Sequence, residues 1–344
     1  MAERTPAEDG FHMPAEWAPH DRCWMGWPCR ESLWGDDLEA ARDAYAAVAR
    51  AIAGFEPVTM LVNEAQLADA RTRCGDAVTC QALPLDDSWL RDTGPTFVVN
   101  GRGGIAGVDW RFNAWGEKFL PWDQDALIAE RLLARLGVPR YAAPLVLEGG
   151  SIHVDGEGTL LTSEECLLNP NRNPDLDRAA IEALLRRYLG VEAFVWLGQG
   201  LDKDDTDGHV DNIACFVAPG VVMAVTCDDP ADPNHAILAD NLARLRKAKD
   251  ARGRSLEIVE LPLPREPRHV DGPGGSQRLA LSYVNYYIAN GGIVMPSFDD
   301  THDALARDIV AKAFPDRRVA QVPAGDILVG GGGIHCITQQ QPKP

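Results

Sequence analysis

The chain has 344 residues, of which 45% are hydrophobic and 24% charged, so it holds enough apolar material for a sizeable core. Its formal net charge of −18 argues against a nucleic-acid partner, because phosphates need lysine and arginine, and suits a cationic small molecule or simply a soluble surface. It has neither a run of about 18 apolar residues nor the apolar stretch of a secretory signal, so we expect no membrane partner and a cytoplasmic location.

Helical and extended patterns alternate along the chain. Apolar residues recur at helical spacing in five segments, which are 38–54, 126–138, 177–191, 236–253 and 303–315. Short apolar runs typical of strands lie between them, at 57–62, 96–100, 104–110, 151–154, 159–163, 193–197, 212–217, 221–225, 256–262, 291–296, 318–323 and 326–330. The proline-rich stretch 261–278 predicts a surface loop and not a domain linker, because the alternation resumes after it. The sequence therefore predicts one mixed α/β domain over residues 1–344.

The chain has eight cysteines, which are Cys23, Cys29, Cys74, Cys80, Cys166, Cys215, Cys227 and Cys336. A cytoplasmic chain of this size does not need disulfides, and the absence of a C-x-x-C pair argues against a zinc or redox site. Most of these cysteines stand among apolar residues, so each by itself is more typical of a core side chain than of a nucleophile.

Reactive and charged residues gather beside glycines at the ends of predicted strands. Asp92 lies in the turn "RDTGP", and Glu148 precedes two glycines in "LEGGS". His209 and Asp211 stand two apart in "GHVDN", so we expect them on one face of an extended segment. Cys336 follows a run of four glycines, and such a run suits close approach of the backbone to another group.

Each of these residues also has an ordinary structural explanation. An aspartate in a turn is usually a cap, a single histidine is more often structural than catalytic, and an isolated cysteine is usually a core thiol. The set as a whole is harder to explain in this way. A thiol, an imidazole and three carboxylates are the groups needed for attack of a thiolate on a cationic carbon.

Six long motifs follow one another along the chain, which are "MPAEWAPHDRCWMGWP", "DDSWLRDTGPTFVVN", "LEGGSIHVDGEGTLLTSEECLLNPNRNP", "GHVDNIACFV", "SYVNYYIANGGIVMPSFDD" and "GGGGIHCITQQQP". In content and order they resemble the agmatine deiminase family, within the guanidine-modifying superfamily that includes arginine deiminase and bacterial peptidylarginine deiminase. The resemblance covers nearly the whole chain. It implies a pentein-type α/β propeller of five ββαβ-like modules around a central polar site.

The resemblance also implies a role for each residue of the set. Cys336 is the nucleophile, His209 is the general acid and base, and Glu148 orients His209. Asp92 and Asp211 hold the guanidinium nitrogens. The implied reaction converts agmatine and water to N-carbamoylputrescine and ammonia, in putrescine and polyamine biosynthesis, with no cofactor or metal and in a homo-oligomer.

The choice of substrate depends on further residues. Trp89, beside Asp92, either stacks on the alkyl chain or guanidinium of the substrate or belongs to the core. Arg111 replaces a glycine that is usual in the family, and Asp207 replaces an asparagine. Arg111 either meets a substrate carboxylate or points to solvent. Deimination of free or peptide-bound arginine, or transfer of the amidino group to an amine, therefore remain alternatives.

Overall fold

The computed structural model describes residues 4–272 and 275–344. Its strands are β1 His20–Gly26, β2 Val58–Val62, β3 Val78–Ala82, β4 Thr96–Asn100, β5 Gly104–Arg111, β6 Arg140–Val146, β7 Ile152–Val154, β8 Thr159–Ser163, β9 Ala193–Leu197, β10 Ala214–Ala218, β11 Val221–Thr226, β12 Glu257–Pro262, β13 His269–Gly272, β14 Gly275–Arg278, β15 Tyr287–Ala289, β16 Gly292–Ser297, β17 Arg318–Pro323 and β18 Thr338–Pro342. Its α-helices are α1 Glu31–Trp34, α2 Leu38–Ala53, α3 Leu67–Cys74, α4 Leu90–Thr93, α5 Ala114–Glu117, α6 Ile128–Leu136, α7 Glu164–Leu167, α8 Arg178–Leu189, α9 Pro233–Lys247, α10 Asp303–Ala313 and α11 Gly325–Leu328.

One strand pattern recurs in five sheets of the described chain. The sheets β4-β5-β6, β7-β8-β9, β10-β11-β12 and β15-β16-β17 each pair two antiparallel strands and add a third strand parallel to the second. A helix connects the two parallel strands each time, because a parallel pair needs a long crossover. The sheet β18-β1-β2-β3 repeats the pattern, with α2 between β1 and β2. The repeated unit is thus the ββαβ module that the resemblance implied.

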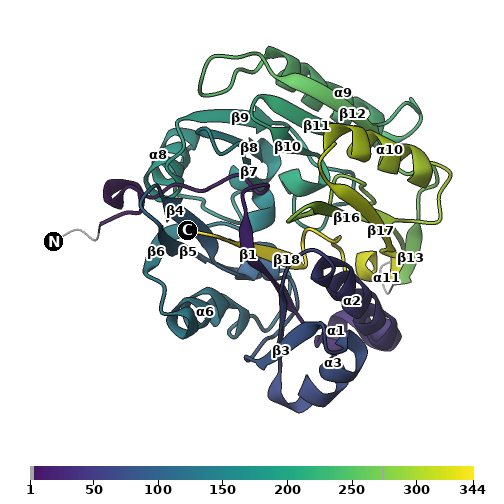
Figure 1. Cartoon of the computed structure of the whole chain (residues 1–344). Coiled ribbons are helices and arrows are strands. Elements are labelled where there is room, and N and C mark those ends of the chain that lie inside the picture. Colours follow the sequence, from purple (N-terminus) through teal and green to yellow (C-terminus); the bar gives the residue numbers. More distant parts are fainter. Residues whose placement is uncertain (1–3, 273–274) are drawn as a thin grey trace.

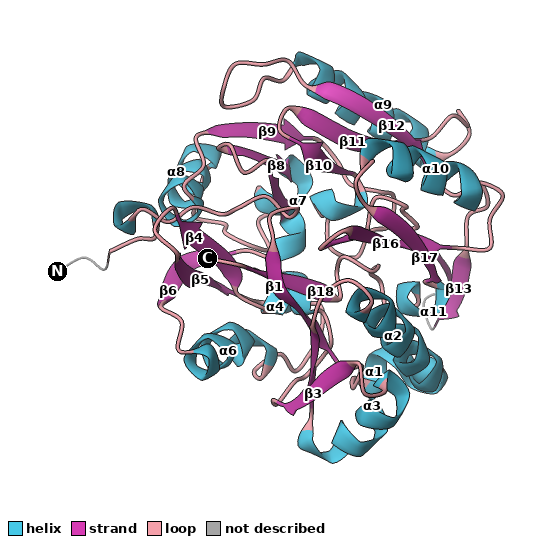
Figure 2. Cartoon of the chain, viewed as in Figure 1, coloured by secondary structure: helices cyan, strands magenta, loops and turns pink. Residues whose placement is uncertain are grey.

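The last strand of the chain completes the first sheet. β18 pairs antiparallel with β1, so that Gln340 lies opposite Cys23. Figure 1 shows β1 and β18 side by side, and the five sheets follow one another in chain order around the molecule. Figure 2 shows the strands toward the inside and the larger helices toward the outside. This arrangement confirms the mixed α/β class.

The five expected helices are confirmed as α2, α6, α8, α9 and α10. The largest difference concerns α9, which ends at Lys247 although the pattern predicted a helix to residue 253. The chain turns there because Asp250 accepts the backbone N–H groups of Arg252 and Arg254 at 2.9 and 2.8 Å. Within the described ranges, no helix has both the length and the apolar composition that a bilayer crossing requires.

Two expectations about the C-terminal third are wrong. The run 326–330 was expected to be a strand, but it holds α11, in which the N–H of Leu328 bonds the carbonyl of Ala324 at 3.1 Å. Five residues are too few for periodicity to separate a short helix from a strand. The stretch 261–278 was expected to be a loop, but it contains β13 and β14, which pair as a hairpin; its residues 273–274 lie outside the described residues.

Candidate active site

Each of the five repeated sheets is entered through a segment that carries a buried polar side chain. Asp92 precedes β4, Glu148 precedes β7, Asp211 precedes β10, Asn285 precedes β15 and Cys336 precedes β18. Contacts between these segments, and hydrogen bonds from Asn285, show that they meet at one place. Repetition of one module therefore brings residues from opposite ends of the chain into a single site. The sequence predicted every member of this series except Asn285.

Asp92 and Asp211 lie at the centre of the site with their carboxylates partly engaged. Asp92 accepts hydrogen bonds at 2.9 Å from the N–H of Gly150 and from the indole N–H of Trp115. Asp211 Oδ2 accepts one at 2.9 Å from His335, while Oδ1 is buried without a partner. Burial raises the pKa of Asp92. Burial would also raise the pKa of Asp211, but the hydrogen bond and charge of His335 and the charge of His209 together outweigh it and lower that pKa.

His209 lies between two carboxylates and is fully buried. Its Nδ1 is 3.8 Å from Asp92 Oδ2, its Nε2 is 3.9 Å from Glu148 Oε2, and neither nitrogen has a hydrogen-bond partner. Burial alone would lower the pKa of His209, but Asp92, Cys166 and Glu148 together outweigh it and hold that pKa well above the usual value. The histidine is therefore protonated at neutral pH.

The backbone around His209 and Asp211 differs from the expected extended segment. A 3₁₀ turn, Val210–Asn212, begins directly after His209, and the N–H of Asn212 bonds the carbonyl of His209 at 3.3 Å. Strand β10 begins only at Ala214. The two side chains reach the same site because a tight turn carries them there, and not because they alternate along a strand.

Glu148 is held by an arginine that the motif analysis did not single out. Its Oε1 accepts a hydrogen bond from Arg172 Nε at 2.8 Å, while Oε2 faces His209 without a partner. Burial would raise the pKa of Glu148, but the interactions with His209 and Arg172 outweigh it and lower that pKa. Glu148 is therefore ionised and stands beside a charged histidine.

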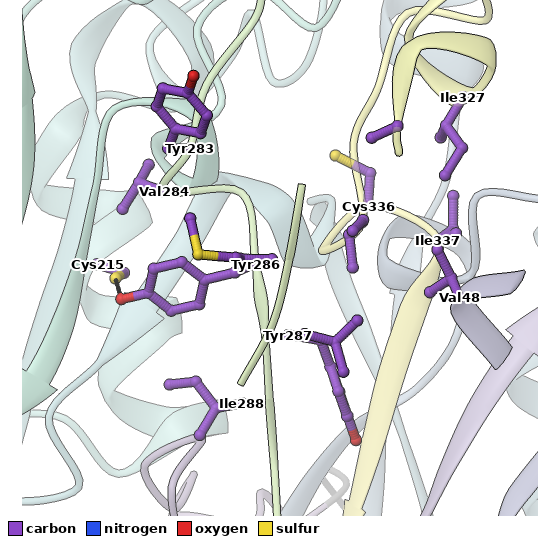
Figure 3. Packing of buried hydrophobic residues seen from close by; sticks show 14 of the residues in the cluster. Val48, Cys215, Tyr283, Val284, Tyr286, Tyr287, Ile288, Ile327, Cys336 and Ile337 are labelled. Atoms are coloured by element: carbon purple, nitrogen blue, oxygen red, sulfur yellow. Dashed lines mark hydrogen bonds between the residues drawn. The ribbon is translucent and has the colours of Figure 1, made fainter. Parts of the chain in front are cut away.

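The thiol of Cys336 faces this group of charges. Its Sγ is 3.2 Å from Asn285 Nδ2 and 3.4 Å from Asp211 Oδ2. Burial, Asp211 and Asp92 together raise the pKa of Cys336 well above the usual value, so the resting side chain is a thiol. Figure 3 shows Cys215 apart from it, with its thiol 2.9 Å from the hydroxyl of Tyr286. Among these two buried cysteines, only Cys336 is in the charged site.

The glycine run before Cys336 lets the backbone pass close to three side chains. A Cβ on Gly330 would collide with Trp34, one on Gly332 would lie 2.5 Å from the ring of Trp89, and one on Gly333 would collide with Asn285. Gly331 has a φ of +97°, a backbone conformation that residues with a side chain rarely adopt. Close approach, as the sequence predicted, is therefore the reason for the run.

A pocket opens onto Cys336 and has both aromatic and acidic walls. Trp89, Trp115 and Phe119 form part of its lining, together with Asp92 and Asp205. Trp89 also stacks on Trp34, with ring centroids 5.9 Å apart, and is only 4% exposed. The two interpretations of Trp89 are thus compatible, because the ring belongs to the core and also lines the pocket.

Arg111 and Asp207, which the motif analysis singled out, lie outside that pocket. Arg111 is exposed at the end of β5 and does not line it. Asp207 is half-buried and binds Lys118 at 2.7 Å and Arg172 at 2.6 Å, and its pKa is lowered because these hydrogen bonds outweigh burial. A second pocket beside the first shares Asp205 with it and is lined by two cations, Lys203 and Arg278.

One group in the described part of the chain has ligand atoms close enough to hold a metal. It consists of Glu148, Cys166 and His209, whose ligand atoms lie within 4.8 Å of one another. The guanidinium of Arg172 already binds Glu148, and His209 is protonated by its carboxylate neighbours. Both features oppose a bound cation, so the arrangement fits acid–base chemistry better than metal binding.

Comparison with known proteins decides the family. The model of the Porphyromonas-type peptidyl-arginine deiminases matches residues 12–342. The chain belongs to this family. It is 52% identical to agmatine deiminase from Ectopseudomonas mendocina, over 99% of this chain and 98% of that protein.

Solved structures of this family have the same fold. Agmatine deiminase from Enterococcus faecalis superimposes with a TM-score of 0.96 at 40% identity, over 100% of this chain and 99% of that chain. A cysteine-to-serine variant of agmatine deiminase from C. jejuni, solved with substrate bound, superimposes with a TM-score of 0.87 at 28% identity, over 97% and 96%. The resemblance inferred from the motifs is thus confirmed along the whole chain.

Proposed function

We propose that this chain is an agmatine deiminase, which hydrolyses agmatine to N-carbamoylputrescine and ammonia. The observation that carries the proposal is a set of buried polar atoms without partners around the Cys336 thiol. The acceptors among them are Asp211 Oδ1 and Glu148 Oε2, and both ring nitrogens of His209 are also without a partner. Buried polar groups normally have partners, so the two carboxylate oxygens suit a ligand with several N–H groups. A guanidinium is planar, cationic and carries five of them.

The two aspartates place the carbon of the guanidinium in front of sulfur. Asp92 and Asp211 pair with its nitrogens, and the positive charge offsets the two carboxylates that raise the pKa of Cys336. Substrate binding thus favours the thiolate in a site that otherwise disfavours it. Sγ gives up its proton to water and bonds to the guanidinium carbon, and the resulting tetrahedral intermediate is neutral, because the thiolate charge and the guanidinium charge cancel.

His209 moves the protons in both halves of the reaction. As an acid it protonates the departing nitrogen, the C–N bond breaks and ammonia leaves, so that an amidino group that still carries the aminobutyl chain remains bonded to Cys336. The neutral His209 then takes a proton from water, which attacks the same carbon, and the C–S bond breaks to release the carbamoyl product. Glu148 keeps the imidazole oriented from 3.9 Å away.

Residues at the mouth of the site distinguish the substrates. Asp205 lines both pockets, and its Oδ2 lies near Gly331 of the glycine run, so it is placed to meet the ammonium end of agmatine. Asp87 also lines the pocket that opens onto Cys336, but its carboxylate already binds Arg30 at 2.8 Å. Deimination of arginine is the second candidate function, since Lys203 lines the second pocket and can meet a carboxylate of the substrate.

The reaction has further expected features. The wild type needs no cofactor or metal in this mechanism, because the thiol, the imidazole and water supply every step. We infer a single catalytic domain over residues 1–344, a homo-oligomer, a cytoplasmic location and a place in putrescine biosynthesis. An amidinotransferase would need an amine in place of water as the second nucleophile, and product analysis with added amine separates the two.

An ammonia-release assay tests the proposal directly. Agmatine, free arginine and a peptide-bound arginine are compared with wild type and with Cys336→Ser, which lacks the nucleophile. We expect rapid release from agmatine and none from the variant. Release from arginine at an equal rate would overturn agmatine as the preferred substrate, and an active Cys336→Ser would overturn the mechanism.

A further inference from the structure

The N-terminal motif "MPAEW" places a buried carboxylate behind the active site. Glu16 is 3% exposed although it lies in no helix or strand. Its Oε1 accepts hydrogen bonds from Arg91 at 3.1 Å and from His335 Nε2 at 2.9 Å. None of the roles proposed above uses this residue.

His335 joins Glu16 to the substrate-binding carboxylate. Its Nε2 faces Glu16, and its Nδ1 is 2.9 Å from Asp211 Oδ2. An ionised carboxylate only accepts hydrogen bonds, so both ring nitrogens must carry hydrogen to serve both neighbours. A neutral imidazole has one N–H, and therefore the geometry requires the imidazolium form of His335.

The remaining charges around His335 do not change this requirement. Arg91 donates to the carbonyl of His335 at 3.3 Å and disfavours its charge, and His153 lies 3.5 Å from the far oxygen of Glu16. Cys336 follows His335 and is a thiol at rest. The pKa of His335 is nevertheless raised, because Glu16 and Asp211 outweigh burial and Arg91.

We propose that Glu16 is a positioning residue, which acts through His335 to hold Asp211 and balances the charge of His335 in a site that must accept a cation. The proposal rests on the proposed function, since only a cationic substrate makes the balance matter. With Glu16 present, Asp211 Oδ2 is occupied by a charged donor and Oδ1 is left for the guanidinium. Without the negative charge of Glu16, the net charge of a site that contains the imidazolium of His335 is more positive by one unit.

Glu16→Gln tests this idea because the amide keeps the size and the acceptor oxygen but loses the charge. The pKa of His335 should then fall. At acid pH His335 stays protonated with Asp211 as its one remaining counter-ion among the two, so its charge weakens the attraction of the site for agmatine, and at alkaline pH it becomes neutral and this effect disappears. The ratio of kcat/KM, variant to wild type, should thus rise with pH by about tenfold, mainly through KM.

Glu56→Gln is the matched control, since Glu56 is a buried glutamate 3.1 Å from His20 and contacts no residue of the active site. The ratio of kcat/KM between Glu56→Gln and wild type should not change with pH. Glu16→Asp keeps the negative charge, so its ratio to wild type should not change with pH either. A flat or falling ratio for Glu16→Gln would overturn the proposal.

A spectroscopic measurement decides the matter independently of turnover. In ¹⁵N spectra of histidine-labelled free enzyme at neutral pH, assigned with His335→Gln, both nitrogens of His335 should be protonated. Only one should be protonated at alkaline pH in Glu16→Gln. A neutral His335 in the wild type would refute the inference, even if Glu16→Gln does not fold. Absence of ammonia release by wild type would instead refute only the proposed function.

Discussion

At the scale of single residues, the site is governed by two aspartates that share one substrate charge. Replacing either Asp92 or Asp211 by asparagine leaves the guanidinium half-paired in a buried site, at a cost of about 3–5 kcal/mol by comparison with broken buried ion pairs. We expect kcat/KM for agmatine to fall at least about 10²-fold in each variant. Asp109→Asn removes a buried carboxylate bound to Arg140 and should cost stability without this loss. Near-normal kcat/KM in Asp92→Asn or Asp211→Asn would remove that residue from the site.

The directions of the pKa shifts predict a bell-shaped pH profile. Asp92 must be ionised to bind the cation, and burial raises its pKa, so kcat/KM should fall as the pH drops through that raised pKa. His209 must be protonated to release ammonia, and its pKa is raised, so the rate should fall as the pH rises through it. Glu148→Gln removes a carboxylate that raises the pKa of His209, and the alkaline limb should therefore move to lower pH. An alkaline limb that stays in place would contradict the assignment.

The residues found from the sequence differ physically from those that were missed. Cys336, His209 and the three carboxylates stand in glycine-flanked motifs whose reactive side chains are conspicuous. Asn285 was missed because it sits inside the apolar run "SYVNYYIA", with no glycine beside it. Arg172 and Glu16 act through contacts with residues 24 and 319 positions away, Glu148 and His335, and no local pattern reveals such pairs.

At the scale of elements, the glycine run is the most testable feature. A methyl group on Gly332 would press on the ring of Trp89 and lie 3.1 Å from the Cβ of Cys336. We expect Gly332→Ala to lower kcat/KM and to destabilise the fold by about 1–3 kcal/mol, as overpacking does. Gly101→Ala, with nothing within 4 Å and no positive φ, should change stability by less than about 0.5 kcal/mol. Equal behaviour of the two variants would show that close approach is not the function of the run.

The predictability of the elements depended on their length and periodicity. The five long amphipathic helices were found because 11 or more residues of repeated pattern separate helix from strand. Strands β1, β3, β6, β15 and β18 were not expected. The polar run "TQQQP" of β18 shows why, because its burial comes from pairing with β1, which is distant in sequence. Long-range pairing overrides local preference there.

At the scale of the whole molecule, negative charge should select a dicationic substrate. Arginine adds a carboxylate at the end of the substrate that Asp205 faces, in the field of the buried carboxylates Asp92, Asp211 and Glu148, so we expect agmatine to be preferred by about 10²-fold in kcat/KM if the penalty is near 3 kcal/mol. Arg111→Gly should leave both activities unchanged, because Arg111 is exposed away from the pocket. Lys203→Ala should reduce any residual arginine turnover selectively. Loss of arginine turnover in Arg111→Gly would contradict the exposed position of that side chain.

The central claim is that Cys336 carries the covalent intermediate, and acid-quenched turnover with agmatine tests it most directly. Peptide mass spectrometry of the quenched enzyme should find, on Cys336 alone, an amidino group that still carries the aminobutyl chain of agmatine. Cys336→Ser should yield no adduct and no ammonia while keeping its fold. The account would be contradicted by an adduct on Cys215 or Cys227, or by ammonia release from Cys336→Ser.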